Sequence, residues 1–102
     1  MKRFSSKKII GDWKIIKTNR PPSNNPDYDI FKTICVINDK VMKTIFPNGR
    51  IIMLNYQPTK NGIFLIPKYG NGWNLKINMT DCDNYLIIKS DDGFTDWMEK
   101  IT

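Results

Sequence analysis

The chain has 102 residues, and its 16 basic and 10 acidic side chains give a formal net charge of +6. This length supports one domain with one modest core, so we treat residues 1–102 as a single domain with a basic N-terminal arm over residues 1–8. Histidine is absent, which excludes the commonest general base, the commonest metal ligand and the Ser–His and Cys–His nucleophile systems.

Short apolar and β-branched runs alternate with turn signals about every eight to twelve residues, a pattern typical of all-β domains. The first loop contains three prolines, which cannot donate to a β-ladder. At Pro47-Asn48-Gly49, proline presets the first corner and Gly49 can take the left-handed position that closes a hairpin. Eight strands are predicted in chain order: Gly11–Thr18, Tyr28–Ile37, Val41–Phe46, Arg50–Gln57, Ile63–Lys68, Trp73–Thr80, Tyr85–Ser90 and Phe94–Ile101.

The connections favour one topology. All of them except the first are short, so strands adjacent in sequence should pair antiparallel. Closing the sheet removes its exposed edges. The predicted fold is therefore an all-β, eight-stranded, antiparallel up-and-down β-barrel without a substantial helix. In such a barrel the first, third, fifth and seventh loops lie together at one end, which would be the mouth.

Two strands carry informative side-chain patterns. From Trp73 to Met79, apolar and polar residues alternate, which predicts a half-buried strand. The run Ile51-Ile52-Met53-Leu54 is apolar on both faces. Its outer face is therefore expected to be covered by a partner or by a chain terminus, or to remain an exposed apolar surface.

No constellation of residues predicts catalysis or metal binding. Cys35 and Cys82 are not in a CxxC spacing, so no zinc site is expected; a disulfide and two free thiols are both open. Asp91 and Asp92 adjoin in a predicted turn, where carboxylates are usually solvated. The segment Asp81–Asn84 lacks the glycine and glutamate of an EF-hand loop. We therefore expect a non-enzymatic protein without a metal or cofactor.

The chain shows no targeting signal. Its first residues lack the apolar run of a secretory signal, and no stretch approaches the ~20 apolar residues of a membrane helix. We expect a cytoplasmic protein without a transmembrane segment. The many isoleucine, lysine and asparagine residues and the absence of alanine fit an AT-rich gene, as in many viruses and low-GC bacteria.

Three segments resemble the lipocalin family, in its short bacterial form. Gly11-Asp12-Trp13 resembles the first-strand signature of lipocalins, and Thr80-Asp81-Cys82-Asp83-Asn84-Tyr85 resembles their turn between strands six and seven. Trp97-Met98-Glu99-Lys100 is similar to the last strand of bacterial lipocalins, where a basic residue lies across the opening tryptophan. The resemblance implies that the barrel is closed at one end by Gly11, Trp13, Thr80, Asp81, Tyr85 and Lys100.

The resemblance also implies a calyx that holds a small hydrophobic or amphipathic molecule. Basic Lys17 and Arg50 are expected near the rim, facing an anionic head group, and Tyr56 and Tyr69 are expected at the mouth. The apolar lining is expected to come from Ile15, Ile34, Val36, Leu54, Leu75 and Ile77.

Two other functions remain open. A barrel this small can be filled by its own side chains and act through its outer surface as a protein-binding module, homodimer or viral inhibitor, with residues 51–54 as the interface. Alternatively, a basic β-barrel can bind nucleic acid or a nucleotide by stacking bases beside lysines. The candidate residues for that function are Arg50, Lys68, Tyr69, Trp73 and Lys76.

Overall fold

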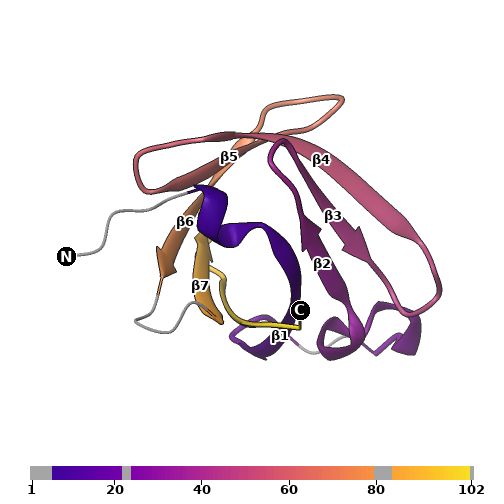
Figure 1. Cartoon of the computed structure of the whole chain (residues 1–102). Coiled ribbons are helices and arrows are strands. Elements are labelled where there is room, and N and C mark those ends of the chain that lie inside the picture. The colour runs from indigo at the N-terminus through magenta and orange to yellow at the C-terminus, as the bar shows by residue number, and fades with distance from the viewer. Residues whose placement is uncertain (1–5, 22–23, 80–83, 102) are drawn as a thin grey trace.

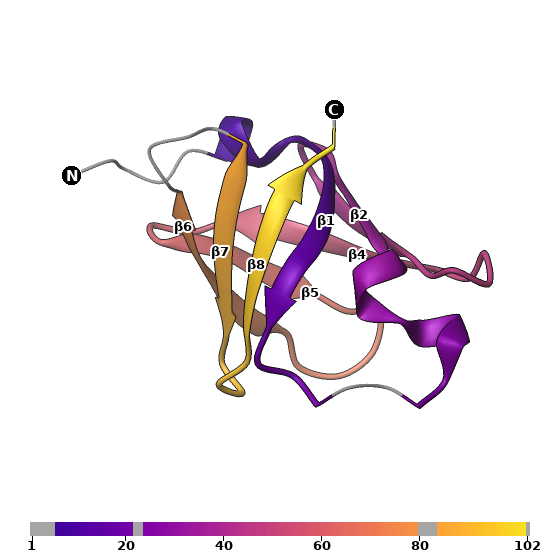
Figure 2. The same cartoon turned by 90° about the horizontal axis from the view of Figure 1, so that it is seen from below.

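The computed structural model describes residues 6–21, 24–79 and 84–101, and its eight strands form a closed barrel in the order β1 to β8. Figure 1 shows the strands arranged as a ring, and Figure 2 shows β8 lying between β7 and β1. The strands are β1 (Gly11–Thr18), β2 (Ile34–Ile37), β3 (Val41–Ile45), β4 (Ile51–Pro58), β5 (Gly62–Ile66), β6 (Trp73–Met79), β7 (Tyr85–Ser90) and β8 (Thr95–Lys100).

Each strand pairs antiparallel with the next, and β1 also pairs with β8 to close the ring. At the closing seam, Trp13 lies opposite Lys100 and Ile15 lies opposite Met98. A β-bulge between Ile15 and Lys17 shifts the register, so that Lys17 lies opposite Trp97. The predicted eight-stranded antiparallel up-and-down barrel is confirmed.

The β3–β4 hairpin has the turn chemistry that its sequence predicts. Gly49 has a φ of +88°, a backbone conformation that L side chains rarely adopt. Its N–H donates to the Phe46 carbonyl at 2.9 Å, and the Asn48 side chain accepts from the Arg50 N–H at 2.9 Å. The side-chain oxygen of Asn48 therefore fixes the turn that the following glycine completes.

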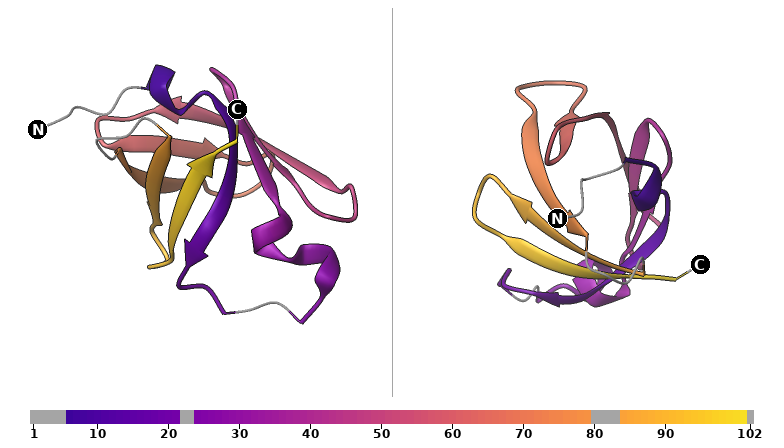
Figure 3. Two further views of the ribbon diagram at one scale, coloured as in Figure 1. Left: turned by 60° about the horizontal axis from the view of Figure 1, so that its bottom comes forward. Right: turned by 60° about the vertical axis from the view of Figure 1, so that its left-hand side comes forward.

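The segment before β2 differs from the prediction. Residues 28–33 were expected to extend the strand, but two 3₁₀-helices form instead, η2 (Pro26–Tyr28) and η3 (Ile30–Lys32). The Asn25 side chain accepts a hydrogen bond from the Asp27 N–H, and the Asp29 side chain accepts one from the Phe31 N–H. Such Asx contacts offer the backbone an alternative to a β-ladder. Figure 3 shows this segment at the end of the barrel away from the N-terminal 3₁₀-helix η1 (Ser6–Ile9).

The largest fully buried side chains lie at the η1 end of the barrel, which we call the closed end. Trp13 and Ile9 are fully buried there, and the Trp13 indole N–H donates to the Ile9 carbonyl at 2.8 Å. Helix η1 thus covers this end and is tied to the core. The other largest fully buried side chains are Ile37, Ile63 and Leu86. No described segment forms a helix long and apolar enough to span a membrane.

Candidate functional site

A cavity of about 430 Å³ opens at the other end of the barrel, which we call the mouth. This volume is within the ~300–1,000 Å³ range of small-molecule sites. Residues of the first, third and seventh loops line it, together with strand residues beside the fifth loop such as Trp73. The apolar part of its wall consists of Ile15, Ile30, Met42, Phe46, Leu54, Leu65, Trp73, Leu75, Ile88 and Met98.

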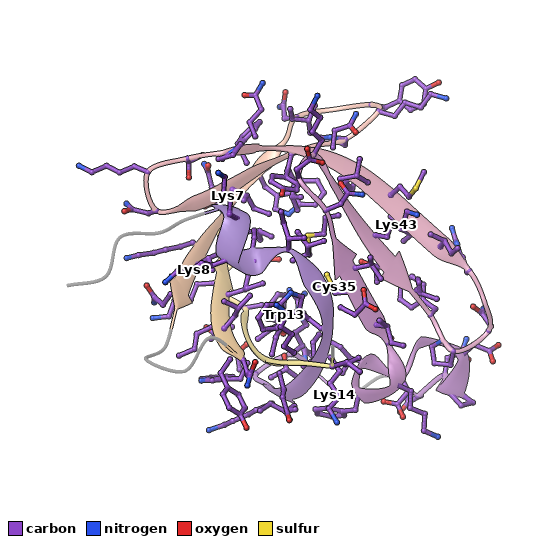
Figure 4. The ribbon with its side chains drawn as sticks, in the orientation of Figure 1. Lys7, Lys8, Trp13, Lys14, Cys35 and Lys43 are labelled. Carbon is purple, nitrogen blue, oxygen red and sulfur yellow. The ribbon has the colours of Figure 1, made fainter. Side chains whose placement is uncertain are left out.

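The floor of the cavity is the packed closed end. Trp13 pairs with Cys35 across β1 and β2, and Cys35 belongs to the cavity wall. Figure 4 shows Trp13 and Cys35 together inside the ring of strands. Because Trp13 fills the barrel below this level, the cavity has a solid floor and is entered from the mouth.

The resemblance to lipocalins implied a basic residue across Trp13, and the structure has one. The Lys100 ammonium lies 5.8 Å from the centroid of the Trp13 ring, within the distance of a cation–π contact. Gly11 has a φ of +147°, and a Cβ built there would lie 2.7 Å from Lys100 Cε. Glycine at this position lets the lysine stem cross the strand end and cover the tryptophan.

The polar part of the cavity wall centres on an ion pair. Arg20, from the first loop, donates from Nε to both Asp96 carboxylate oxygens and from Nη2 to Asp96 Oδ2, each at 3.2 Å. The Thr18 hydroxyl donates to Asp96 Oδ1 at 2.6 Å and accepts from the Arg20 N–H at 3.1 Å. The Arg20 guanidinium also lies 4.7 Å from the Phe94 ring centroid. The first loop is therefore fastened to β8 at the mouth.

The rim carries a second carboxylate, at the β7–β8 turn. Asp92 Oδ1 accepts hydrogen bonds from the Ser90 hydroxyl and, at 3.2 Å, from the Phe94 N–H. These bonds, the Ser90 bond above all, lower the pKa of the Asp92 carboxyl below its ordinary value. Asp92 belongs to the cavity wall, so a ligand at the mouth meets its ionised carboxylate.

Cys35 is a free thiol buried at the inner part of the wall. Burial raises its pKa to about 12, and the nearby Asp96 charge acts in the same direction. A thiolate is the nucleophilic form of cysteine, so at neutral pH this side chain is an unreactive, weakly polar part of the wall. Cys82 lies outside the described residues.

Three of the residues predicted to line a calyx do so: Ile15, Leu54 and Leu75. Ile77 is buried below them in the core. Tyr56 was expected at the mouth, and this is wrong: its hydroxyl donates to the Asn38 carbonyl of the β2–β3 turn, at the closed end. Burial raises the pKa of the Tyr56 phenol, and the charge of Asp39 adds to the shift.

The face predicted for three other residues is wrong. Cys35 and Ile37 are the inward residues of β2, so Ile34 and Val36 lie on the outer face. Lys17 follows the β-bulge, and its ammonium lies 4.8 Å from the Trp97 ring centroid outside the barrel. In a strand that is apolar on both faces, alternation does not show which face points inward, and a bulge cannot be recognised from alternation alone.

The remaining predicted residues are placed as follows. Arg50 is exposed and follows the β3–β4 turn at the mouth end, but it is not among the residues that line the cavity. Tyr85 begins β7 and is 39% exposed. Thr80 and Asp81 lie outside the described residues. The sequence did not predict four polar residues of the cavity wall, which are Arg20, Thr33, Thr44 and Asp96. They come from segments far apart in the sequence, so no local pattern connects them.

The nucleic-acid stripe proposed from the sequence is divided by the fold. Trp73 belongs to the cavity wall. Lys76 lies three residues later on β6, so its side chain is exposed on the outer face. Lys68 lies beside Tyr69, with its ammonium 5.7 Å from the ring centroid, and Tyr69 is 83% exposed. The tryptophan and Lys76 therefore do not share one surface.

A separate apolar surface lies on the outside of β2, β3 and β4. Ile34 pairs with Ile45, and Ile45 pairs with Ile51, so the three form a row across the strands, with Met53 beside it on β4. Ile51 is 54% and Met53 60% exposed. We call these four residues the outer apolar patch. Lys43 pairs with Met53 and lies at its edge.

Within the described ranges 6–21, 24–79 and 84–101, no group of three or more cysteine, aspartate or glutamate side chains could hold a metal ion. Comparison with known proteins gave no match to any family model, curated protein or solved structure.

Proposed function

We propose that the protein binds a small apolar or amphipathic molecule in the barrel cavity and performs no chemistry on it. The observation that carries this proposal is the cavity itself, about 430 Å³ and walled largely by aliphatic and aromatic side chains. Apolar surface gains about 25 cal/mol for each Å² removed from water. An apolar ligand seated here would gain that energy without disturbing the packed closed end.

The size of the cavity limits the ligand. At about 30 Å³ for each water-sized group, a cavity of 430 Å³ accepts on the order of 14 non-hydrogen atoms. A ten-carbon chain with a small head group satisfies this limit. Decanol is therefore a suitable neutral probe, with its chain among Leu54, Leu75 and Met98 and its hydroxyl toward the mouth.

A matched pair of variants tests the proposal by isothermal titration calorimetry with decanol. Leu54→Trp fills the cavity, because Leu54 lines it. Met53→Trp introduces the same side chain one residue earlier, where it lies on the outer face and leaves the cavity unfilled. The proposal predicts one-to-one binding to the wild type and to Met53→Trp, and at least a tenfold loss, about 1.4 kcal/mol, in Leu54→Trp. Equal affinities for the two variants, or no binding to the wild type, would contradict it.

Membership of the lipocalin family also remains part of the proposal. Its support is the eight-stranded barrel, the buried Trp13 in the first strand and the Lys100 contact across it. The cytoplasmic location expected from the sequence likewise stays a prediction.

A second candidate function is favoured by the outer apolar patch. Exposed Ile51 and Met53 beside Lys43 would suit a partner protein that presents an apolar surface with a carboxylate facing the lysine. Met53→Asp would place a charge in the patch and weaken such an interaction without altering the cavity. Retention of partner binding by this variant would exclude the patch as the interface.

A further inference from the structure

The charges at the mouth bear on the kind of head group that the cavity accepts. Among the described residues that line the cavity, three are charged: Arg20, Asp92 and Asp96. Their formal sum is −1, from one guanidinium and two carboxylates. This local sign is opposite to the net charge of +6 on the whole chain.

The single cation of the wall is already engaged. Arg20 directs Nε and Nη2 to the Asp96 carboxylate, in a two-pronged contact with all three distances at 3.2 Å. Asp96 is held in place as well by the Thr18 hydroxyl. A ligand carboxylate that sought Arg20 would have to compete with Asp96, which is 8% exposed and would then lose its partner in a desolvated position.

The rim carboxylate, in contrast, has capacity for a donor. The hydrogen bonds from Ser90 and Phe94 both go to Asp92 Oδ1. The backbone N–H of Asp92 itself is a third donor to this carboxylate. A carboxylate has about four acceptor sites, so exposed Asp92 can still accept a hydrogen bond from a ligand group at the mouth.

The basic residues expected to form the rim do not supply a compensating charge to the wall. The Lys17 ammonium lies over Trp97 on the outer face, and Arg50 does not line the cavity. At about 0.15 M salt the screening length is ~8 Å. Charges elsewhere on the surface are thus attenuated relative to those at the mouth.

On these grounds we infer that the cavity selects amphiphiles with a positively charged amine head group and discriminates against carboxylates of the same chain length. The inference rests on the proposed function, because it assumes that the apolar chain enters the barrel. It adds the chemical class of the head group, which would lie at the mouth beside Asp92 and Asp96.

Three ligands of one chain length test the inference: decylamine, decanol and decanoate. At pH 7 the amine is protonated and the carboxylate is ionised. Each is titrated calorimetrically into the wild type at about 0.15 M salt. We expect decylamine to bind at least about tenfold more tightly than decanoate, with decanol between them. The charge of +6 on the whole chain favours the anion, so a preference for the amine must arise locally.

Two variants locate the effect. Asp92→Asn keeps an oxygen that can accept from Ser90 and Phe94 but removes the charge, and it should reduce the ratio of amine to carboxylate affinity at least threefold. Asp39→Asn makes the same change in charge on an exposed residue of the β2–β3 turn, at the closed end. The ratio should be unchanged in this control.

The outcomes separate the two proposals. If decanol binds but decanoate binds as tightly as decylamine, or if the two variants give the same ratio, the inference is wrong and the proposed function stands. If none of the three ligands binds the wild type, the proposed function itself fails, and the inference fails with it.

Discussion

Replacing Trp13 with phenylalanine tests whether the closed end holds the barrel together. Trp13 is fully buried, and its indole N–H donates to the Ile9 carbonyl at 2.8 Å. Phenylalanine keeps most of the packing but removes the donor. An unsatisfied buried carbonyl costs about 1–3 kcal/mol, and the lost ring atoms cost about 1 kcal/mol more. We therefore expect Trp13→Phe to lower the free energy of unfolding by about 3 kcal/mol, a large share of the ~5–15 kcal/mol typical of a domain.

The matched control is Trp97→Phe, which removes an indole from the outer face. Trp97 is half-buried and contacts the Lys17 ammonium at 4.8 Å, so its replacement should cost at most about 1 kcal/mol. Urea unfolding followed by far-ultraviolet circular dichroism measures both changes without depending on tryptophan emission. If Trp13→Phe costs no more than Trp97→Phe, the assignment of Trp13 as the structural centre of the closed end is wrong.

Three further predictions concern the wall and the seam of the barrel. Burial raises the pKa of the Cys35 thiol from 9.0 to about 12. As pH rises, the unfolded chain therefore loses this proton before the folded protein does. The free energy of unfolding should then fall above about pH 9, by up to ~1.4 kcal/mol per pH unit. Urea titrations of the wild type and Cys35→Ala between about pH 8 and 10 should diverge in slope, and parallel curves would contradict this. A double-mutant cycle of Arg20→Gln and Asp96→Asn should give a coupling energy of about 1 kcal/mol, since Arg20 is one-third exposed. Additive effects of the two substitutions would show that the ion pair does not contribute to stability. Gly11→Ala should cost at least about 1 kcal/mol in thermal or urea unfolding, because its φ of +147° suits glycine, and a neutral result would refute that constraint.

The sequence was sufficient to predict the barrel because its turns are marked by residues with specific backbone preferences. The Pro47-Asn48-Gly49 turn is one example, and Gly49 has the expected left-handed conformation. The same kind of argument failed before Ile34, where Asn25 and Asp29 side chains bond to the backbone and support 3₁₀-helices. Proline and Asx residues were present in that segment as signals, but the apolar residues after Tyr28 suggested a longer strand.

The binding site was harder to predict than the fold. Alternation identified Leu75 correctly, because polar residues flank it on β6. On β2 every residue from Ile34 to Ile37 is apolar or nearly so, and no pattern chooses the inward face. The Arg20–Asp96 contact joins residues 76 positions apart, and no local signal in the sequence connects them. The rim was therefore expected to be basic, whereas the fold places two carboxylates there.

We propose that a small apolar molecule occupies the barrel cavity and not the outer surface. The most direct measurement is a titration of the isotopically labelled protein with decanol, followed by ¹H–¹⁵N correlation NMR. We expect saturable shifts at amides of the cavity wall, such as Thr44, Leu54 and Leu75, with little change at Ile34 and Met53 on the outer face. Shifts concentrated on the outer apolar patch, or no saturable shifts, would contradict it.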